Sequence, residues 1–236
     1  MTTQEVLQEL ALYGSEQTKK VFRKHGAREP FYGVKVADLR KLQKKLKKNS
    51  QLAEELYNTG NSDAMYLAGL IADPSLMSKE QLQRWVDKAY WYMLSEHTVA
   101  NVTADSPWGY ELALKWIKAD KEQVVAAGWA TLSGIVSVKE DETLNLSVLK
   151  QLLQRVEKDI HQAPNRVRYT MNNFVIALGC YVSGLTEMAK KTAGKIGAVH
   201  VNMGETACKV PQALAYIEKV EGMNRIGKKR KSAQGN

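Results

Sequence analysis

The chain has 236 residues, of which 44% are hydrophobic and 25% are charged. A disordered chain is poorer in hydrophobic residues, and a chain of this length can bury the core of a single domain. Lys and Arg number 34 against 25 Asp and Glu, so the formal net charge is +9. This excess favours a polyanionic partner such as nucleic acid, with the alternative that the charge serves solubility alone.

The cysteines and the N-terminal sequence limit the class of protein. Cys180 and Cys208 are the only cysteines, which excludes a disulfide framework and favours a reducing compartment; we expect both thiols to fill the core. Residues 1–14 lack the basic and apolar regions of a signal peptide, and no run approaches the roughly 18 apolar residues of a membrane span. We therefore expect a cytoplasmic protein with no membrane contact.

The first strongly periodic segment, residues 36–48, combines an apolar stripe with a cationic face. Val36, Leu39, Leu42 and Leu46 recur at the spacing of one helical face. The polar positions carry one Arg and five Lys, and like charges at i, i+3 and i+4 repel each other, which a bound polyanion would relieve. A solvated outer face is the alternative reading. The cations proposed to contact nucleic acid are Arg40, Lys41, Lys44 and Lys45.

The next segments, up to residue 129, predict short helices that carry the aromatic residues. Ser78 followed by Gln81 is a capping box, the signature of a helix start. All five Trp lie between Trp85 and Trp129. Glu96 lies four residues after Tyr92, so the two share a helix face, and an aromatic wall with a carboxylate is suited to a planar cation. The alternative is a Trp-rich core with Glu96 on the surface.

The segment after Pro164 predicts a second basic site at the start of a helix. Asn165 is the expected N-cap residue, and Arg166 and Arg168 lie in the first turn. The amides of a helix N-terminus point outward and attract anions, and Arg can bind a phosphate through two hydrogen bonds. We therefore predict phosphate contacts from Arg166 and Arg168.

The C-terminal part contains a loop and a basic tail. Residues 196–210 have two Gly and a β-branched patch and predict a long ordered loop. Residues 224–236 follow a single domain spanning 1–223 and predict a flexible tail that contacts phosphates without sequence selectivity. The tail cations proposed for this role are Arg225, Lys228, Lys229 and Arg230.

The whole pattern predicts an all-α fold of helix pairs. Gly and Pro interrupt the chain at short intervals, helical periodicity fills the gaps, and no alternating strand pattern with a hairpin turn occurs. Short helices joined by tight turns favour αα-hairpins stacked in a curved solenoid with a concave face, with an irregular helical bundle as the alternative. The four His are scattered, and no metal-binding spacing or Gly-rich phosphate loop appears, so we predict no metal and no cofactor.

Four stretches of sequence resemble the AlkD-like DNA alkylation repair family. They are FYGVKVADLR at residues 31–40, the Trp91–Tyr92 pair, KWI at 115–117 and VRYTMNNFVI at 167–176. The resemblance extends over nearly the whole chain. It implies a solenoid of HEAT-like repeats with a concave, basic groove for duplex DNA.

Active members of that family are DNA glycosylases that excise N3- or N7-alkylated purines by using two Trp, an Asp and an Arg. The resemblance places the first Trp at Tyr92 and the Asp at Glu96, which keep an aromatic ring and a carboxylate. It places the Arg at Ala126 and the second Trp near Ile176, so these two roles are not conserved.

The resemblance and the charge pattern together predict a DNA-binding protein of the alkylation repair family. For a glycosylase, Glu96 would be the catalytic carboxylate and Tyr92, with Trp91 or Trp129, would line the lesion. Two alternatives remain: a non-catalytic binder of damaged, bent or branched DNA, and a helical-repeat scaffold for an acidic protein partner.

Overall fold

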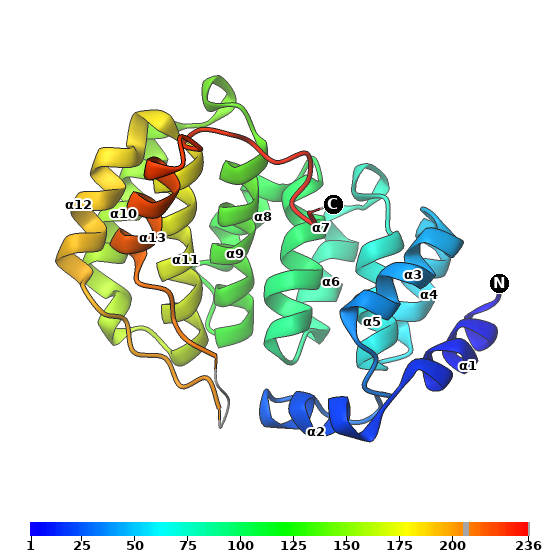
Figure 1. Ribbon diagram of the computed structural model, residues 1–236. Coiled ribbons are helices and arrows are strands. Elements are labelled where there is room, and N and C mark those ends of the chain that lie inside the picture. The colour runs from blue at the N-terminus through cyan, green and yellow to red at the C-terminus, as the bar shows by residue number, and fades with distance from the viewer. Residues whose placement is uncertain (205–207, 236) are drawn as a thin grey trace.

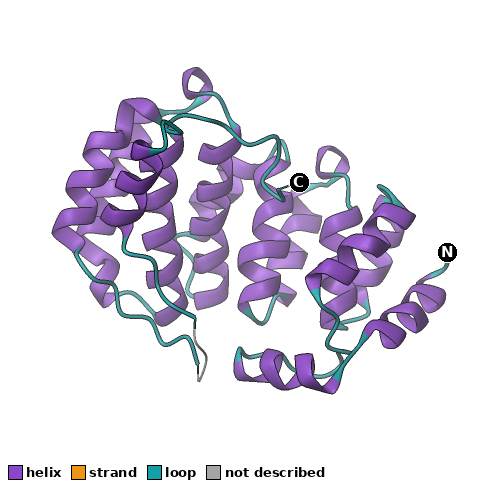
Figure 2. Cartoon of the chain, viewed as in Figure 1, coloured by secondary structure: helices purple, strands orange, loops and turns teal. Residues whose placement is uncertain are grey.

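The computed structural model describes residues 1–204 and 208–235, and in these ranges every regular element is helical (Figure 2). No helix among them is long and apolar enough to cross a bilayer. The α-helices are α1 (Thr3–Tyr13), α2 (Glu16–Lys24), α3 (Val36–Leu46), α4 (Ser50–Asn58), α5 (Ser62–Ile71), α6 (Lys79–Lys88), α7 (Ala100–Asp105), α8 (Gly109–Trp116), α9 (Glu122–Val138), α10 (Leu146–Asp159), α11 (Asn165–Tyr181), α12 (Thr186–Ile196) and α13 (Ala213–Gly222). A π-helical segment, η2 (Met93–Val99), runs directly into α7.

The helices form a curved row of packed pairs (Figure 1). In one layer α5 contacts η2, η2 and α7 contact α9, and α9 contacts α11. In the second layer α4 packs on α5, α6 on η2, α8 on α9 and α12 on α11. The all-α class and the stacked helix pairs predicted from periodicity are therefore confirmed.

The apolar stripes explain why these segments are helical. On α10, Leu149, Leu152, Leu153 and Val156 are all buried, as their spacing predicts. The predicted capping box also forms: the Ser78 hydroxyl accepts from the Gln81 amide, and the Gln81 side chain accepts from the Ser78 amide. Burying such a stripe against the next layer stabilises helices of only two to four turns, which are marginal alone.

Two hydrophobic cores meet at α8 and α9. Leu112 and Trp116 of α8 belong to the N-terminal core, whereas Ala113 of the same helix and its C-cap residue Ile117 belong to the C-terminal core. The helix α9 likewise contributes to both cores. The two helices therefore join the halves of the molecule, because each contributes residues to both cores.

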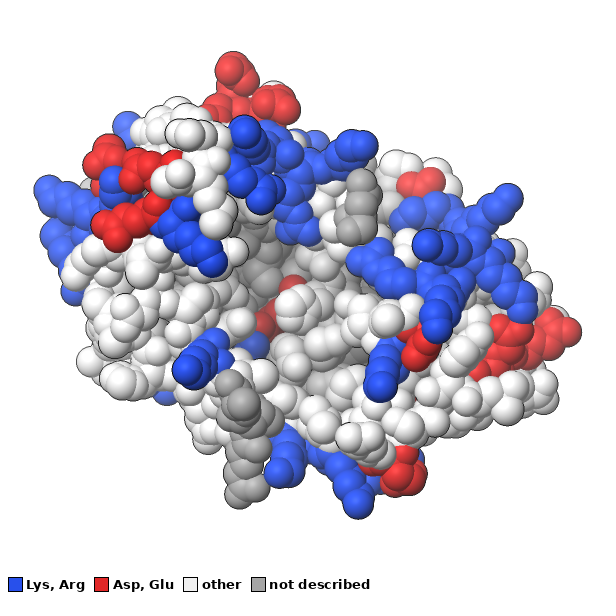
Figure 3. Space-filling model, in the orientation of Figure 1, with Lys and Arg blue, Asp and Glu red and all other residues white. Residues whose placement is uncertain are grey.

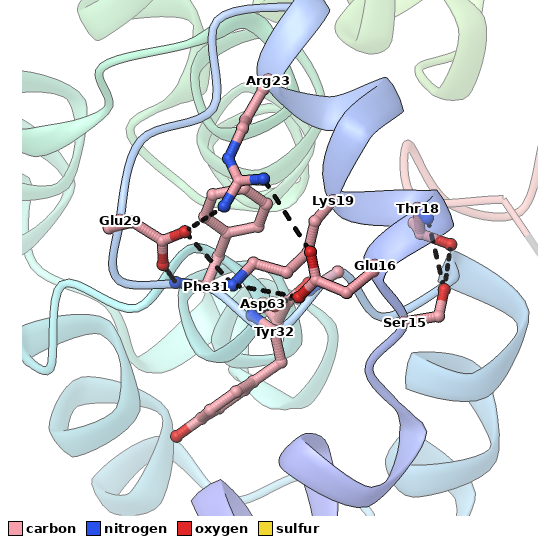
Figure 4. Close-up of polar contacts among 10 residues, drawn as sticks. Ser15, Glu16, Thr18, Lys19, Arg23, Glu29, Phe31, Tyr32 and Asp63 are labelled. Carbon is pink, nitrogen blue, oxygen red and sulfur yellow. Dashed lines mark hydrogen bonds and ion pairs between the residues drawn. The ribbon is translucent and has the colours of Figure 1, made fainter.

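A buried carboxylate fixes the connection between α2 and α3. Asp63, at the start of α5, accepts hydrogen bonds from the backbone amides of Tyr32 (2.6 Å), Gly33 (3.0 Å) and Val34 (3.0 Å). Figure 4 shows Asp63 and Tyr32 beside Phe31, whose ring is covered by the side chain of Lys19. The segment FYGV at residues 31–34 thus has a structural role, because Asp63 accepts from its last three amides and Glu29 accepts from the amide of Phe31.

The basic tail differs from the flexible segment expected. Residues 225–235, here called the strap, cross one edge of the row from α11 to α5 (Figure 1). The amide of Gly227 donates to the carbonyl of Cys180 (2.9 Å), and that of Arg230 donates to Ser137 (2.7 Å). Ala233 is 3% exposed, and its amide donates to the Asp105 carboxylate.

The last contacts of the strap reach the N-terminal core. The Gln234 side chain donates to the carbonyl of Gly69, and Arg40 donates to the carbonyl of Gln234 (2.8 Å). The strap thus lies along the C-terminal ends of α11, α9, α7 and α5. Helix C-termini present unpaired carbonyls and a partial negative charge, so a cationic segment with free amides is stable there. Hydrophobic periodicity cannot reveal this kind of contact.

Candidate nucleic-acid interface

A hollow lies at the centre of the concave face, with Lys and Arg gathered around its rim (Figure 3). We call it the groove, and we assign to its floor Tyr66, Tyr92, His97 and Asn101, which come from α5, η2 with its N-cap residue, and α7. His97 is exposed, and its ring lies 5.9 Å from that of Tyr92, edge to face. Tyr66, His97 and Asn101 line one small recess there together.

Glu96 lies beneath the groove on η2 and is held by Arg166 of α11. The side chain of Glu96 is 4% exposed. Arg166 donates through Nε to Oε1 (2.7 Å) and through Nη2 to Oε2 (2.6 Å), so both carboxylate oxygens are occupied. Burial raises the pKa of the Glu96 carboxyl, and the hydrogen bonds from Arg166 oppose that shift. The pair is a two-point ion pair with little access to solvent.

Two aromatic rings enclose the Arg166 guanidinium. Its central carbon lies 4.7 Å from the ring centroid of Tyr92 and 4.5 Å from that of Tyr169. Burial raises the pKa of Tyr92 to about 12, so its ring is a neutral phenol at physiological pH. Tyr92, Tyr169 and Glu96 therefore form a cation site of the kind that the sequence suggested, and Arg166 fills it.

The predicted phosphate seat at the start of α11 is wrong. Pro164, not Asn165, is the N-cap residue, and the Asn165 side chain instead binds the backbone of Asn202. The amide of Arg166 donates to a carboxylate oxygen of Glu122 (2.7 Å). An acidic group already occupies this helix end, and the Arg166 side chain is turned toward Glu96, so neither feature is open to a phosphate.

Two aromatic residues proposed to line a lesion lie in the core. Trp91 is 5% exposed, and its indole donates to the Ser62 hydroxyl (2.9 Å). Trp129 is 0% exposed and packs on Phe174 with ring centroids 5.1 Å apart. Both side chains are therefore core residues, as the alternative reading of the Trp cluster predicted. Neither has surface left for a ligand. Tyr92 alone of the three proposed aromatics borders the groove.

The lysines of α3 differ from one another in the residues that they contact. Lys41 pairs with Asp38 (2.7 Å) and Lys45 with Glu9, so acidic residues of the chain relieve part of the predicted repulsion. Lys44 is exposed. Exposed ion pairs contribute little stability, so Lys41 and Lys45 can still exchange partners at modest cost.

The cations of the strap also differ in exposure and in their contacts. Arg225, Lys228 and Arg230 are exposed. Lys229, with a side chain only 10% exposed, donates to Asp141 (2.7 Å) and to the carbonyl of Val136 (3.0 Å). Lys229 is therefore a structural anchor of the strap, which corrects its assignment to nucleic-acid contact. Arg168 is partly buried, and its Nε has no hydrogen-bond partner among the described residues.

The structure also adds residues that sequence reasoning missed. Tyr169 and Glu122 complete the surroundings of Arg166, and His97 lies open on the groove floor. The only signal for Tyr169 was its position three residues after Arg166. Of the two cysteines, Cys180 is buried as expected, whereas Cys208 is exposed, so the expectation for Cys208 was wrong. The long loop was also expected to be ordered; residues 205–207 of it lie outside the described ranges.

The comparisons with known proteins agree with this architecture. Two uncharacterized relatives are 36% identical to the chain: one from Listeria innocua serovar 6a over 224 residues, covering 92% of this chain and 96% of the relative, and one from Listeria monocytogenes serovar 1/2a over 217 residues, covering 89% and 93%. The chain is also similar to a solved structure from a family related to the HEAT-like repeat DNA glycosylases with affinity for branched DNA structures. That likeness has a TM-score of 0.90 and 38% identity and covers 98% of each chain.

This likeness confirms the HEAT-like solenoid that the resemblance implied. The model of the family described as "DNA alkylation repair enzyme" matches residues 6–186, well over half of the chain. The chain therefore belongs to the DNA alkylation repair enzyme family.

Proposed function

We propose that the protein binds branched DNA in its basic groove and does not excise bases. The observation that carries the proposal is the closed Glu96–Arg166 pair beneath a groove whose rim is cationic. Cations along a concave surface bind the phosphate backbone with little dependence on sequence. The affinity of the related protein family for branched DNA structures supports the same class of partner.

The state of Glu96 argues against glycosylase chemistry. A carboxylate that stabilises the developing sugar cation must face the reacting sugar with a free oxygen. Both oxygens of Glu96 instead accept from Arg166, and the side chain is 4% exposed. The position expected to provide the phosphate-binding Arg holds Ala126, which is fully buried.

One observation favours excision of N3- or N7-alkylated purines as a second candidate. The Tyr92, Tyr169 and Glu96 site accepts a planar cation, since it holds a guanidinium. An alkylated purine is also a planar cation. For this activity Arg166 would have to leave Glu96, which would then be the catalytic carboxylate while Tyr92 lined the lesion.

Binding is tested by gel shift with a four-way junction and with a linear duplex of equal length. We expect the junction to bind more tightly, and we expect the logarithm of the association constant to fall linearly with the logarithm of salt concentration, by about 0.9 per phosphate contact. Absence of binding to either DNA, together with binding of an acidic peptide, would favour the scaffold alternative instead.

Excision is tested by release of 7-methylguanine from alkylated duplex DNA. We expect the wild-type protein to release no more base than the Glu96→Gln variant or a protein-free control. Release by the wild type that disappears in Glu96→Gln would establish the glycosylase and refute the non-catalytic proposal.

A further inference from the structure

A second cationic hollow is bounded by the strap and shares lining residues with the recess on the groove floor. We call it the basic hollow; it has a volume of about 900 Å³ and is formed by the C-terminal part of α3, the turn after α5, the C-terminal ends of α7 and α9, and the strap. Its charged lining residues are Arg40, Lys44, Lys47, Lys48, Lys139, Lys231, Asp73 and Asp105.

The cations of the basic hollow are largely free, whereas its acids are committed. In the described part of the chain, the side chains of Lys44, Lys47, Lys139 and Lys231 form no ion pair. Both oxygens of Asp105 accept from the amide of Ala233 in the strap. One oxygen of Asp73, Oδ1, accepts from the hydroxyl and the amide of Ser75. The lining therefore has six cations against two carboxylates, an excess of four positive charges.

A shared wall separates the basic hollow from the groove. Arg40, Leu70 and Gln234 line both the basic hollow and the recess that holds His97 on the groove floor. The wall is fixed by two hydrogen bonds, from Arg40 to the Gln234 carbonyl and from the Gln234 side chain to the Gly69 carbonyl. The two cationic surfaces are thus adjacent but distinct.

The lining indicates which part of a nucleic acid would be bound. The basic hollow contains no aromatic side chain among its described residues. Proteins that bind unpaired bases stack them on aromatic rings, whereas Lys and Arg alone contact phosphates. The positive charge is also spread over α3, the end of α9 and the strap, and the volume far exceeds one phosphate. These features fit a length of phosphodiester backbone.

We propose that the basic hollow binds the phosphate backbone of a second DNA arm while a first arm lies in the groove. This inference rests on the proposed function and extends it, because it names the surface that distinguishes a branched molecule from a linear one. A linear duplex in the groove leaves the basic hollow empty. A junction sends another arm past the Arg40–Gln234 wall and gains the contacts of Lys47, Lys139 and Lys231.

The test compares junction and duplex binding by a charge-reduced variant. The triple variant Lys47→Gln, Lys139→Gln, Lys231→Gln removes three exposed cations that have no ion pair among the described residues. The matched control is Lys150→Gln, Lys158→Gln, Lys191→Gln, which removes three exposed cations from α10 and α12 at the other end of the row. Both variants therefore have the same net charge.

We expect the hollow variant to bind the four-way junction about tenfold or more weakly, with a salt slope reduced by up to about 2.7, and to bind the linear duplex like the control variant. Equal losses for junction and duplex, or no loss for either, would overturn the inference while leaving the proposed function standing. Failure of the wild-type protein to bind any DNA would instead refute the proposed function.

A further arm of the test uses inorganic tripolyphosphate as competitor. We expect it to displace the junction only as general salt does, by an equal factor for both variants. Saturable tripolyphosphate binding that the hollow variant loses, with no change in junction affinity, would identify a site for a small phosphate compound and overturn the second-arm proposal.

Discussion

At the scale of single residues, the central feature is that Arg166 donates two hydrogen bonds to the Glu96 carboxylate. The two residues are 70 positions apart, and the sequence marked each for a separate role. Their pairing could not be predicted because it depends on how η2 and α11 are placed across α9. A buried carboxylate whose partner is removed is strongly unfavourable, whereas an apolar replacement of both partners is often tolerated.

Replacing Arg166 with Met should therefore destabilise the fold by about 3–5 kcal/mol, because Glu96 would remain buried without a partner. The double variant Glu96→Leu, Arg166→Met should recover much of that loss. Urea unfolding followed by circular dichroism measures both.

The matched control for that experiment is Arg168→Met, two residues along the same helix. Arg168 is partly buried without an ion pair in the described chain, so we expect a change below about 1 kcal/mol. If Arg166→Met lowers the free energy of unfolding no more than Arg168→Met does, the Glu96–Arg166 pair does not stabilise the fold.

At the scale of elements, two connections depend on backbone amides that find acceptors far away in the sequence. The segment between α2 and α3 is held by Asp63, and the strap is held in part by Asp105. Periodicity predicted the helices on either side of these connections, such as α10 with its four buried residues. It carried no information on the connections, because a carboxylate that accepts from distant amides leaves no local pattern.

Asp63→Ala should destabilise the protein by about 2–4 kcal/mol, because two buried amides and one partly buried amide lose their acceptor. Hydrogen exchange at Tyr32, Gly33 and Val34 should become faster than at the core of α5. Asp38→Ala, which removes an exposed ion pair with Lys41, should change stability by less than about 1 kcal/mol. Unchanged exchange at the three amides would contradict the assigned role of Asp63.

Asp105→Ala should release the end of the strap and expose its basic residues to trypsin. In the wild-type protein the bonded backbone of Arg230 and the buried Ala233 should slow cleavage after Lys229 and Arg230. Mass spectrometry after brief digestion gives the cleavage sites. The control Asp120→Ala changes an exposed acid away from the strap; equal cleavage in both variants would mean that Asp105 does not hold it.

At the scale of the whole molecule, the sequence predicted the architecture well and the site only in part. The stacked all-α fold follows from the helical spacing of apolar residues in the sequence, as on α10. The Trp cluster was ambiguous because large aromatic residues suit a core as well as a ligand wall, and Trp91 and Trp129 prove to be core residues. Glu96 and Tyr92 do lie together, but the occupant of their site comes from α11.

The two cores should unfold together, because α8 and α9 contribute residues to both of them. We expect urea midpoints from circular dichroism and from Trp fluorescence to coincide. In a Trp129→Phe variant the remaining indoles include Trp85, Trp91 and Trp116, all of the N-terminal core, so its fluorescence isolates that half. A fluorescence midpoint separated from the dichroism midpoint would reveal two independent units.

The strap has a mechanical consequence for DNA. It is hydrogen-bonded to the C-terminal ends of helices along the curved row. A wider or flatter row of helices would have to break the hydrogen bonds of the strap to Cys180, Ser137 or Gly69. The protein is then the stiffer of the two molecules, so the DNA has to bend to fit the groove. Bending a duplex of 20–30 base pairs costs about 1–6 kcal/mol, whereas a branch point is already flexible. Rigidity alone would thus favour a junction, before any second arm makes contact.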